Sequence, residues 1–172
     1  MICRYLENNR LVEAPADESV FTEHMPLIVV GVGTAGAYAV LAAARLDIAV
    51  LGIDLNSGAG GMGTYGYVSG YYYGAAGGLH LEIDQQAEQL RDALFVDTVE
   101  AKRYLLEKEA LCYGARLWFE ARLTGVYLEH QTVCGVRILA GGQIRHLSCD
   151  VAIDATAEAE LCRMAGCALL GG

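Results

Sequence analysis

The chain has 172 residues, which is enough for one domain with a substantial core but too few for a nucleotide-binding domain together with a full substrate domain. Its net charge of −9 and isoelectric point near 4.8 argue against nucleic acid or an anionic membrane as a partner, because either would be met by clusters of Lys and Arg. We therefore expect a small-molecule substrate and leave the oligomeric state open.

Hydrophobic residues make up 54% of the chain, yet their distribution favours a buried core over a membrane span. The apolar runs around Leu27 and Val50 are short, and Arg45 and Asp47 interrupt the region between them. Buried parallel strands produce the same near-continuous apolar runs. Charges also occur early in the chain, where a signal peptide needs its apolar core, so we expect a cytoplasmic protein.

The six cysteines include no C-x-x-C pair and no grouping with histidine of the kind that binds zinc. An even number of cysteines also allows disulfides in a secreted protein. In a reducing compartment, however, they are expected to remain free thiols, most of them buried. The sequence therefore predicts no metal site and no disulfide framework.

Residues 1–25 form a polar lead-in, which we expect to lie as an arm or an edge strand against a domain over residues 26–172. This lead-in carries no recognisable chemistry. Pro26 has no N–H to donate to a sheet, so it fits the first position of a strand that begins at Leu27.

The stretch that follows, residues 27–54, combines an apolar run, three spaced glycines, an Ala-rich segment and a second apolar run. The glycines form G-x-G-x-x-G directly after the β-rich run, and the segment from about Thr34 to Leu46 favours helix. This order predicts a β-α-β unit in which the helix N-terminus holds the pyrophosphate of a dinucleotide. The predicted site at this turn comprises Gly31, Gly33, Thr34, Ala35 and Gly36.

Each glycine has a separate predicted task. Gly31 lets the chain turn sharply off the strand, Gly33 removes a side chain where the pyrophosphate touches the backbone, and Gly36 lets helix and strand pack closely. The alternative for Gly33 is a tight turn in the left-handed conformation. Asp54, at the end of the second strand, would accept hydrogen bonds from both hydroxyls of an adenosine ribose. Taken alone, Asp54 is more typical of an ordinary turn at the end of a strand.

A segment dense in Gly and Tyr follows over residues 55–78. It carries Val68 and many tyrosines, which favours an ordered loop laid against a flat ligand over low-complexity filler. The tyrosines at 71–73 would either stack on an aromatic ring or pack with their hydroxyls in water, and the sequence leaves both open. No catalytic residue is assigned; His80 is the one histidine close enough to this loop to be considered as a base.

The second half of the chain predicts a helix, a strand and a β-meander in that order. The helical pattern covers residues 96–113, with Asp97 or Thr98 as its cap and Gly114 after its end. Residues 115–121 read as a third parallel strand. Three short β-rich segments then predict a meander with a hairpin at Gly141–Gly142; they cover residues 123–130, 132–140 and 142–149.

The last segment returns to the parallel sheet. We expect a strand at 151–154, a turn at Ala155–Thr156 and a helix that Gly166 caps. The whole pattern predicts an α/β fold, a Rossmann-like domain with a parallel sheet and a three-stranded antiparallel meander.

This order of elements resembles the glutathione-reductase-like flavoproteins with two dinucleotide-binding domains, and within them the FAD-dependent oxidoreductases with a GGxGT-type loop. Gly60 and Gly61 stand where that superfamily carries a second diglycine near the FAD pyrophosphate, and residues 154–161, DATAEAEL, resemble its DATGDGDL turn. Plain NAD-binding Rossmann domains lack both the diglycine and the meander. The resemblance thus implies FAD as the cofactor.

Further cofactor contacts are implied only by this resemblance. They are Leu55 after the strand-end acid, Met62 and Thr64 after the diglycine, Arg122 and Leu123 at the strand that enters the meander, and the turn of Ala155, Thr156 and Ala157. Ala157 stands where the family usually has glycine, and Glu158 and Glu160 replace aspartates. The family's final nucleotide-domain segment and its substrate domain have no counterpart before residue 172.

The resemblance implies an FAD-binding segment of a flavin-dependent oxidoreductase that transfers hydride between an organic substrate and flavin. Two alternatives stay open. One is a non-catalytic dinucleotide-binding module or a truncated fragment, because the substrate-facing half is absent. The other is a Rossmann protein that binds only NAD.

Overall fold

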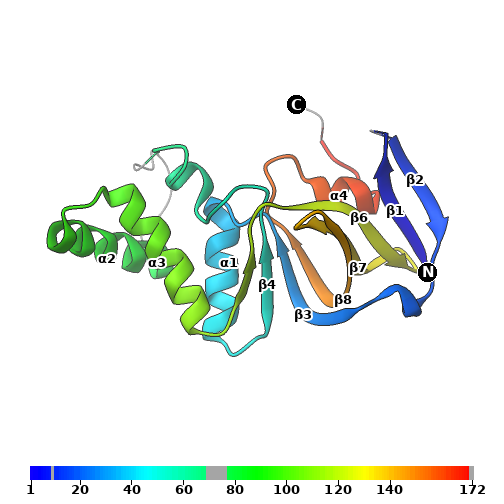
Figure 1. Cartoon of the computed structure of the whole chain (residues 1–172), viewed down its shortest axis with the longest axis horizontal. Coiled ribbons are helices and arrows are strands. Elements are labelled where there is room, and N and C mark those ends of the chain that lie inside the picture. Colours follow the sequence, from blue (N-terminus) through cyan, green and yellow to red (C-terminus); the bar gives the residue numbers. More distant parts are fainter. Residues whose placement is uncertain (9, 69–76, 171–172) are drawn as a thin grey trace.

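The computed structural model describes residues 1–8, 10–68 and 77–170. In this part of the chain the strands form one eight-stranded sheet in the order β2-β1-β6-β7-β8-β3-β4-β5, flanked by helices (Figure 1). The strands are β1 (Ile2–Glu7), β2 (Arg10–Pro15), β3 (Glu23–Val30), β4 (Val50–Ile53), β5 (Arg116–Trp118), β6 (Ala121–Glu129), β7 (Thr132–Ala140) and β8 (Gln143–Asp154). The helices are α1 (Thr34–Arg45), α2 (Gly78–Leu94), α3 (Thr98–Cys112) and α4 (Glu160–Ala165), with short 3-10 turns η1 (Glu18–Val20) and η2 (Gly61–Gly63).

The parallel half of the sheet consists of β8, β3, β4 and β5, and it confirms the predicted β-α-β unit. Its central strand β3 is covered on both faces. Ile28 packs in the cluster that includes residues of α4, whereas Val29 packs with Val40 of α1, and all three side chains are fully buried. Burial on both faces explains why this strand reads as a continuous apolar run.

The antiparallel half contains the predicted meander of β6, β7 and β8. Gly141 and Gly142 form its hairpin turn with φ of +57° and +75°. One prediction was wrong: the third meander strand and the strand at 151–154 are a single strand, β8. Asp150, between Cys149 and Val151, remains in the strand, so β8 leaves its partner β7 and continues beside β3 without a break.

The N-terminal lead-in adds strands to this half of the sheet. β1 and β2 form an antiparallel hairpin, and β1 pairs with β6, so the polar lead-in supplies an edge of the sheet. The predicted start of β3 was wrong, because the strand begins at Glu23 rather than at Leu27. Residues before Pro26 already pair with β8, whereas β4 pairs only from Leu27 onward.

Helices α1 and α3 lie close to their predicted positions. α1 ends at Arg45, and Asp47 follows it in the left-handed conformation with φ of +58°. Asp97 caps α3, since its carboxylate accepts the N–H of Val99 over 2.7 Å. Gly114, with φ of +86°, follows the helix as predicted.

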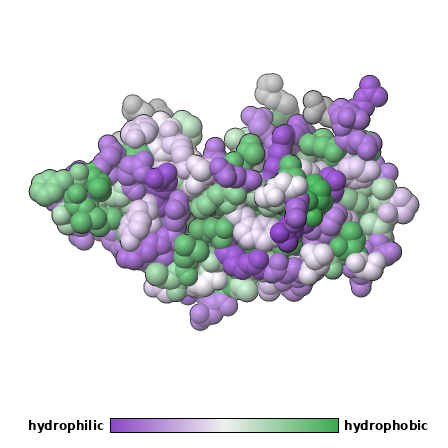
Figure 2. All heavy atoms as spheres, viewed as in Figure 1, coloured by the Kyte–Doolittle hydropathy of each residue, from purple (hydrophilic) through white to green (hydrophobic). Residues whose placement is uncertain are grey.

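Helix α2 was not predicted. It has only two buried residues, Ile83 and Ala87, and its N-cap Gly77 makes no side-chain hydrogen bond, so both the apolar stripe and the start signal are weak. Apolar surface gathers at the end of the molecule where α2 leads into α3 (Figure 2); Leu94 and the 95% exposed Phe95 belong to it. The predicted tyrosine contacts at 71–73 lie outside the described residues.

Candidate cofactor-binding site

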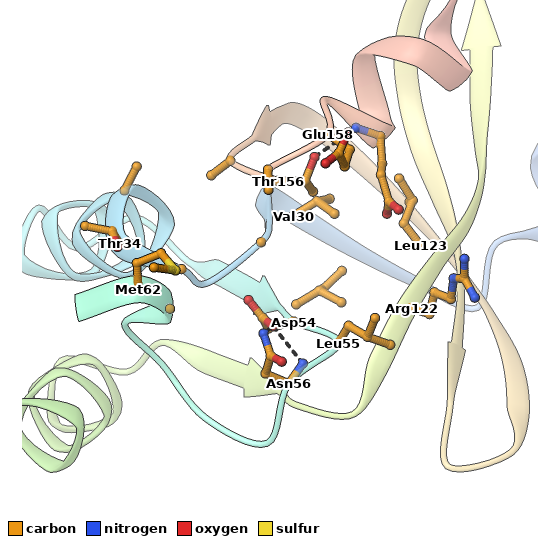
Figure 3. Close-up of a pocket in the computed structure, with 18 of the residues that line it drawn as sticks. Val30, Thr34, Asp54, Leu55, Asn56, Met62, Arg122, Leu123, Thr156 and Glu158 are labelled. Atoms are coloured by element: carbon orange, nitrogen blue, oxygen red, sulfur yellow. Dashed lines mark hydrogen bonds between the residues drawn. The ribbon is translucent and has the colours of Figure 1, made fainter. Parts of the chain in front are cut away.

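A cavity of about 710 Å³ opens at the carboxyl ends of β3, β4 and β8, where open α/β sheets bind ligands. It runs from Thr34 and Met62 at one end to Arg122 and Leu123 at the other, with Asp54 between them (Figure 3). The predicted site residues that line it are Gly31, Gly33, Thr34, Ala35, Asp54, Leu55, Gly61, Met62, Leu123, Ala155, Thr156 and Ala157. Gly36, Gly60 and Thr64 were also predicted, and they support the cavity from outside its lining.

Two glycines of the first turn are required by packing. A Cβ atom on Gly31 would stand 2.6 Å from the carbonyl oxygen of Ala155, and φ at Gly31 is +88°. A Cβ atom on Gly36 would stand 1.7 Å from the carbonyl oxygen of Gly31. No side chain fits at either position, so these two glycines bring the β3–α1 turn against α1 and the β8–α4 turn.

Gly33 differs from both. Its φ of −73° is ordinary for any residue, and a Cβ atom there would find its nearest heavy atom, Cα of Gly61, 4.0 Å away. The structure therefore does not support the left-handed alternative. Gly33 lines the cavity at the N-terminus of α1, and no side chain caps this helix. Such a helix start presents backbone N–H groups and a positive dipole end to an anion.

The diglycine packs directly on this turn. Gly60 and Gly61 are left-handed, with φ of +98° and +53°, and a Cβ atom on Gly61 would stand 2.9 Å from Cα of Gly33. The N–H of Gly60 donates to the carbonyl of Val32 over 2.9 Å, and Oγ1 of Thr34 donates to the carbonyl of Gly60 over 3.1 Å. The two glycine turns thus form one continuous backbone surface at this end of the cavity.

Thr64 stabilises the diglycine loop from behind. Its side chain is buried, and Oγ1 donates to the carbonyl of Ala59 over 2.7 Å. Thr64 does not line the cavity. The hydroxyl is occupied within the loop, so its contribution to the site is to hold the loop's shape.

Asp54 sits at the end of β4 with its carboxylate largely engaged by the protein. Oδ2 accepts the N–H of Val32 over 2.6 Å, and Oδ1 accepts the backbone N–H and the side-chain Nδ2 of Asn56 over 2.8 and 3.0 Å (Figure 3). A carboxylate has about four acceptor positions, so these donors leave about one for a ribose hydroxyl rather than two. Sequence reasoning missed Asn56, a polar residue two positions after a strand-end acid that also lines the cavity.

The β8–α4 turn closes another side of the cavity and is held by Asp154. Its Oδ1 accepts the N–H and the Oγ1 hydroxyl of Thr156 over 3.0 and 2.7 Å, and its Oδ2 accepts the N–H of Cys162 over 2.8 Å. Burial acts to raise the pKa of Asp154, but the hydrogen bonds from Cys162 and Thr156 outweigh it and lower the pKa. Oγ1 of Thr156 in turn accepts the N–H of Glu160 over 2.8 Å.

The positions at which this chain differs from the DATGDGDL turn, residues 157–160, directly follow Thr156. Ala157, which replaces a glycine, lines the cavity and is not among the residues with positive φ, so its methyl group causes no backbone strain. Ala159 is left-handed with φ of +49°. Glu158 and Glu160 add acidic groups to the lining.

Comparison with protein-family models matches residues 26–172 to the family described as FAD dependent oxidoreductase. The chain belongs to this family. The match covers both glycine turns, the meander and the β8–α4 turn, so it includes the residues that line the cavity described above. Comparison with curated protein sequences gives no match.

Solved structures show the same fold in larger proteins. A geranylgeranyl bacteriochlorophyll reductase-like protein from Thermoplasma acidophilum is 21% identical with a TM-score of 0.61, and the match covers 84% of this chain and 42% of that one. The 3-ketosteroid-Δ4-(5α)-dehydrogenase from Rhodococcus jostii RHA1 is 14% identical with a TM-score of 0.57 over 78% and 46% of the two chains. L-proline dehydrogenase from P. horikoshii is 16% identical with a TM-score of 0.54 over 84% and 56%.

This family member spans less than two-thirds of each of these structures. Within its described ranges no helix is long and apolar enough to cross a membrane. In the same ranges no three His, Cys, Asp or Glu side chains gather into a metal site.

Proposed function

We propose that the chain is the FAD-binding part of an enzyme that transfers hydride between an organic substrate and FAD. The observation that carries this proposal is the uncapped N-terminus of α1 at Gly33. No side chain covers the backbone there, so it is open to the cavity. Bound FAD would supply the hydride acceptor, which no side chain of this chain can provide.

Different residues would bind the pyrophosphate and the adenosine ribose of FAD. The backbone at Gly33–Ala35 and Gly61 fits the pyrophosphate, because these positions combine a helix N-terminus with the absence of side chains. Asp54 fits the adenosine ribose through its remaining acceptor position. The acidic composition of the whole chain supports a small organic substrate over nucleic acid or an anionic membrane surface.

The cofactor assignment is tested with the purified chain. We expect flavin absorbance, release of FAD on denaturation, and a rise in melting temperature when FAD is added to the apo protein, because a ligand that binds only the folded state stabilises it. NADH serves as the matched control, since it shares the adenosine and pyrophosphate of FAD. A colourless protein whose melting temperature responds equally to NADH and FAD, or to neither, contradicts the assignment.

A further inference from the structure

Two cysteines meet at the C-terminal end of α4, beyond the β8–α4 turn. The N–H of Cys167 donates to the carbonyl of Cys162 over 3.0 Å, and the N–H of Gly166 donates to the carbonyl of Arg163 over 3.1 Å. Gly166 is left-handed with φ of +84°. These two bonds around a left-handed glycine form a Schellman motif, in which the side chains at the positions of Cys162 and Cys167 commonly contact each other.

The geometry of this motif suits a disulfide. A direct main-chain hydrogen bond joins the two residues, and such a bond brings Cα atoms to a separation comparable with the roughly 4.4–6.8 Å that a disulfide spans. After the larger effect of burial, the carboxylate of Asp154 and the thiol of Cys167 are both near enough to the Cys162 thiol to raise its pKa. Oxidation would therefore require little movement of the backbone.

The two thiols differ in their exposure to solvent. Cys167 is exposed, whereas Cys162 is half-buried. Burial, followed by the hydrogen bond to Asp154, raises the pKa of the Cys162 thiol to about 11. The difference in exposure places Cys167 to encounter an oxidant first and leaves Cys162 as the neighbouring thiol.

We propose that Cys162 and Cys167 form a reversible dithiol–disulfide pair, with hydrogen peroxide as the oxidant. The Cys167 sulfur attacks one peroxide oxygen, the O–O bond breaks, and one water leaves with the thiol proton, which forms a sulfenic acid. The Cys162 sulfur then attacks that sulfur, and the displaced hydroxyl leaves as a second water with the Cys162 proton. Two thiols lose two electrons and one peroxide becomes two waters.

A second cysteine pair provides an internal contrast. Cys134 and Cys149 lie on β7 and β8, one position beyond the paired residues Gly135 and Ser148. Cys149 is only 6% exposed, and burial raises its pKa to about 12. We therefore expect this pair to stay reduced under conditions that oxidise Cys167.

The test treats the reduced chain with stoichiometric hydrogen peroxide, blocks the remaining thiols with iodoacetamide, and digests with trypsin and Glu-C. Cleavage after Glu160 and Arg163 gives peptides 161–163 and 164–172, which separates Cys162 from both Cys149 and Cys167. We expect mass spectrometry to find these two peptides joined by a bond that dithiothreitol breaks.

The Cys167→Ser variant is the matched control, in which Cys162 should be recovered alkylated. Cys112, which is exposed, reports that the peroxide reached surface thiols. Recovery of both peptides separately alkylated at a peroxide dose that oxidises Cys112 overturns the proposal. Linkage of Cys167 to any cysteine other than Cys162, in the same chain or in a second copy, overturns it as well.

Discussion

Two strand-to-helix turns lie side by side at the same edge of the sheet, one after β3 and one after β8, and they are built in opposite ways. The β3–α1 turn contains Gly31 and Gly33, Gly36 follows in the first turn of α1, and α1 begins with no side-chain cap. In the β8–α4 turn, Asp154 and Thr156 accept the N–H groups of Cys162 and Glu160 within the chain itself. The first turn therefore offers donors to a ligand, whereas the second uses its donors to fix its own shape.

The two turns also contact each other, and the second supports the shape of the first. Gly31 leaves room for the carbonyl of Ala155 to approach, so the rigid second turn supports the first. The parallel pairing of β3 with β8 continues to Val30 and Asp154 and brings the turns together. The β3–α1 turn is thus shaped partly by a segment more than a hundred residues away in the sequence.

The largest effect is expected for Gly31→Ala, which tests whether the two turns depend on each other. The added methyl group would meet the Ala155 carbonyl and force an unfavourable left-handed φ, with an expected loss of about 2–5 kcal/mol in the free energy of unfolding. Urea denaturation of the apo protein measures it. A variant that unfolds at the parental urea midpoint would mean that the turns do not touch in solution.

Gly33→Ala separates binding from folding. A methyl group there has space in the apo protein but stands where the pyrophosphate would touch the backbone, so we expect FAD affinity to fall at least a hundredfold, about 2.7 kcal/mol. The apo melting temperature should stay equal to the parent's or rise slightly, because the substitution restricts the unfolded chain. Unchanged quenching of FAD fluorescence in a titration would exclude Gly33 from the phosphate site.

Asp154→Ala tests the second turn. It would leave the N–H of Cys162 and the hydroxyl of Thr156 without their acceptor, and we expect a loss of about 1–3 kcal/mol in stability. Asp154→Asn, which retains one acceptor oxygen, is the matched control and should lose less. Urea midpoints of the three proteins at neutral pH provide the comparison, and equal midpoints would contradict the role given to Asp154.

The pH dependence of stability gives an independent measure of the same carboxylate. Its pKa is lower in the folded protein than in the unfolded chain, so its contribution is fully present above the unfolded-state value near 4. That contribution is lost as the pH falls further through the folded-state pKa. The stability gap between the parent and Asp154→Asn should therefore narrow below pH about 4; a gap that widens on acidification would contradict the lowered pKa.

The smallest effect is expected for Ala159→Gly. Ala159 is left-handed with φ of +49°, so glycine would relieve backbone strain in the folded state. It would also increase the conformational entropy of the unfolded chain, which opposes folding. We expect a net stabilisation of about 0.5–1 kcal/mol from the balance of these effects. Differential scanning calorimetry would detect this change as a rise in melting temperature. Ala157→Gly, at a position without positive φ, is the control that should not gain stability.

Local sequence was sufficient to predict features that depend on local backbone conformation. The glycine spacing after an apolar run predicted the β3–α1 turn, Asp97 predicted the start of α3, and Gly141–Gly142 predicted the hairpin, because each requires a side chain or a φ angle that few other residues supply. The order of these elements was enough to suggest the FAD-dependent family, and the family match confirmed it.

Tertiary structure decided what depends on contacts between distant segments. The pattern G-x-G-x-x-G did not distinguish Gly31, which is closed by Ala155, from Gly33, which is open to the cavity, because the difference is made by β8 and its turn. The same holds for Asp54, whose carboxylate is engaged by Val32 across the β3–β4 pair and by Asn56. Helix α2 was missed because its few buried residues become buried only against α1 and α3, and a sequence records such packing only weakly.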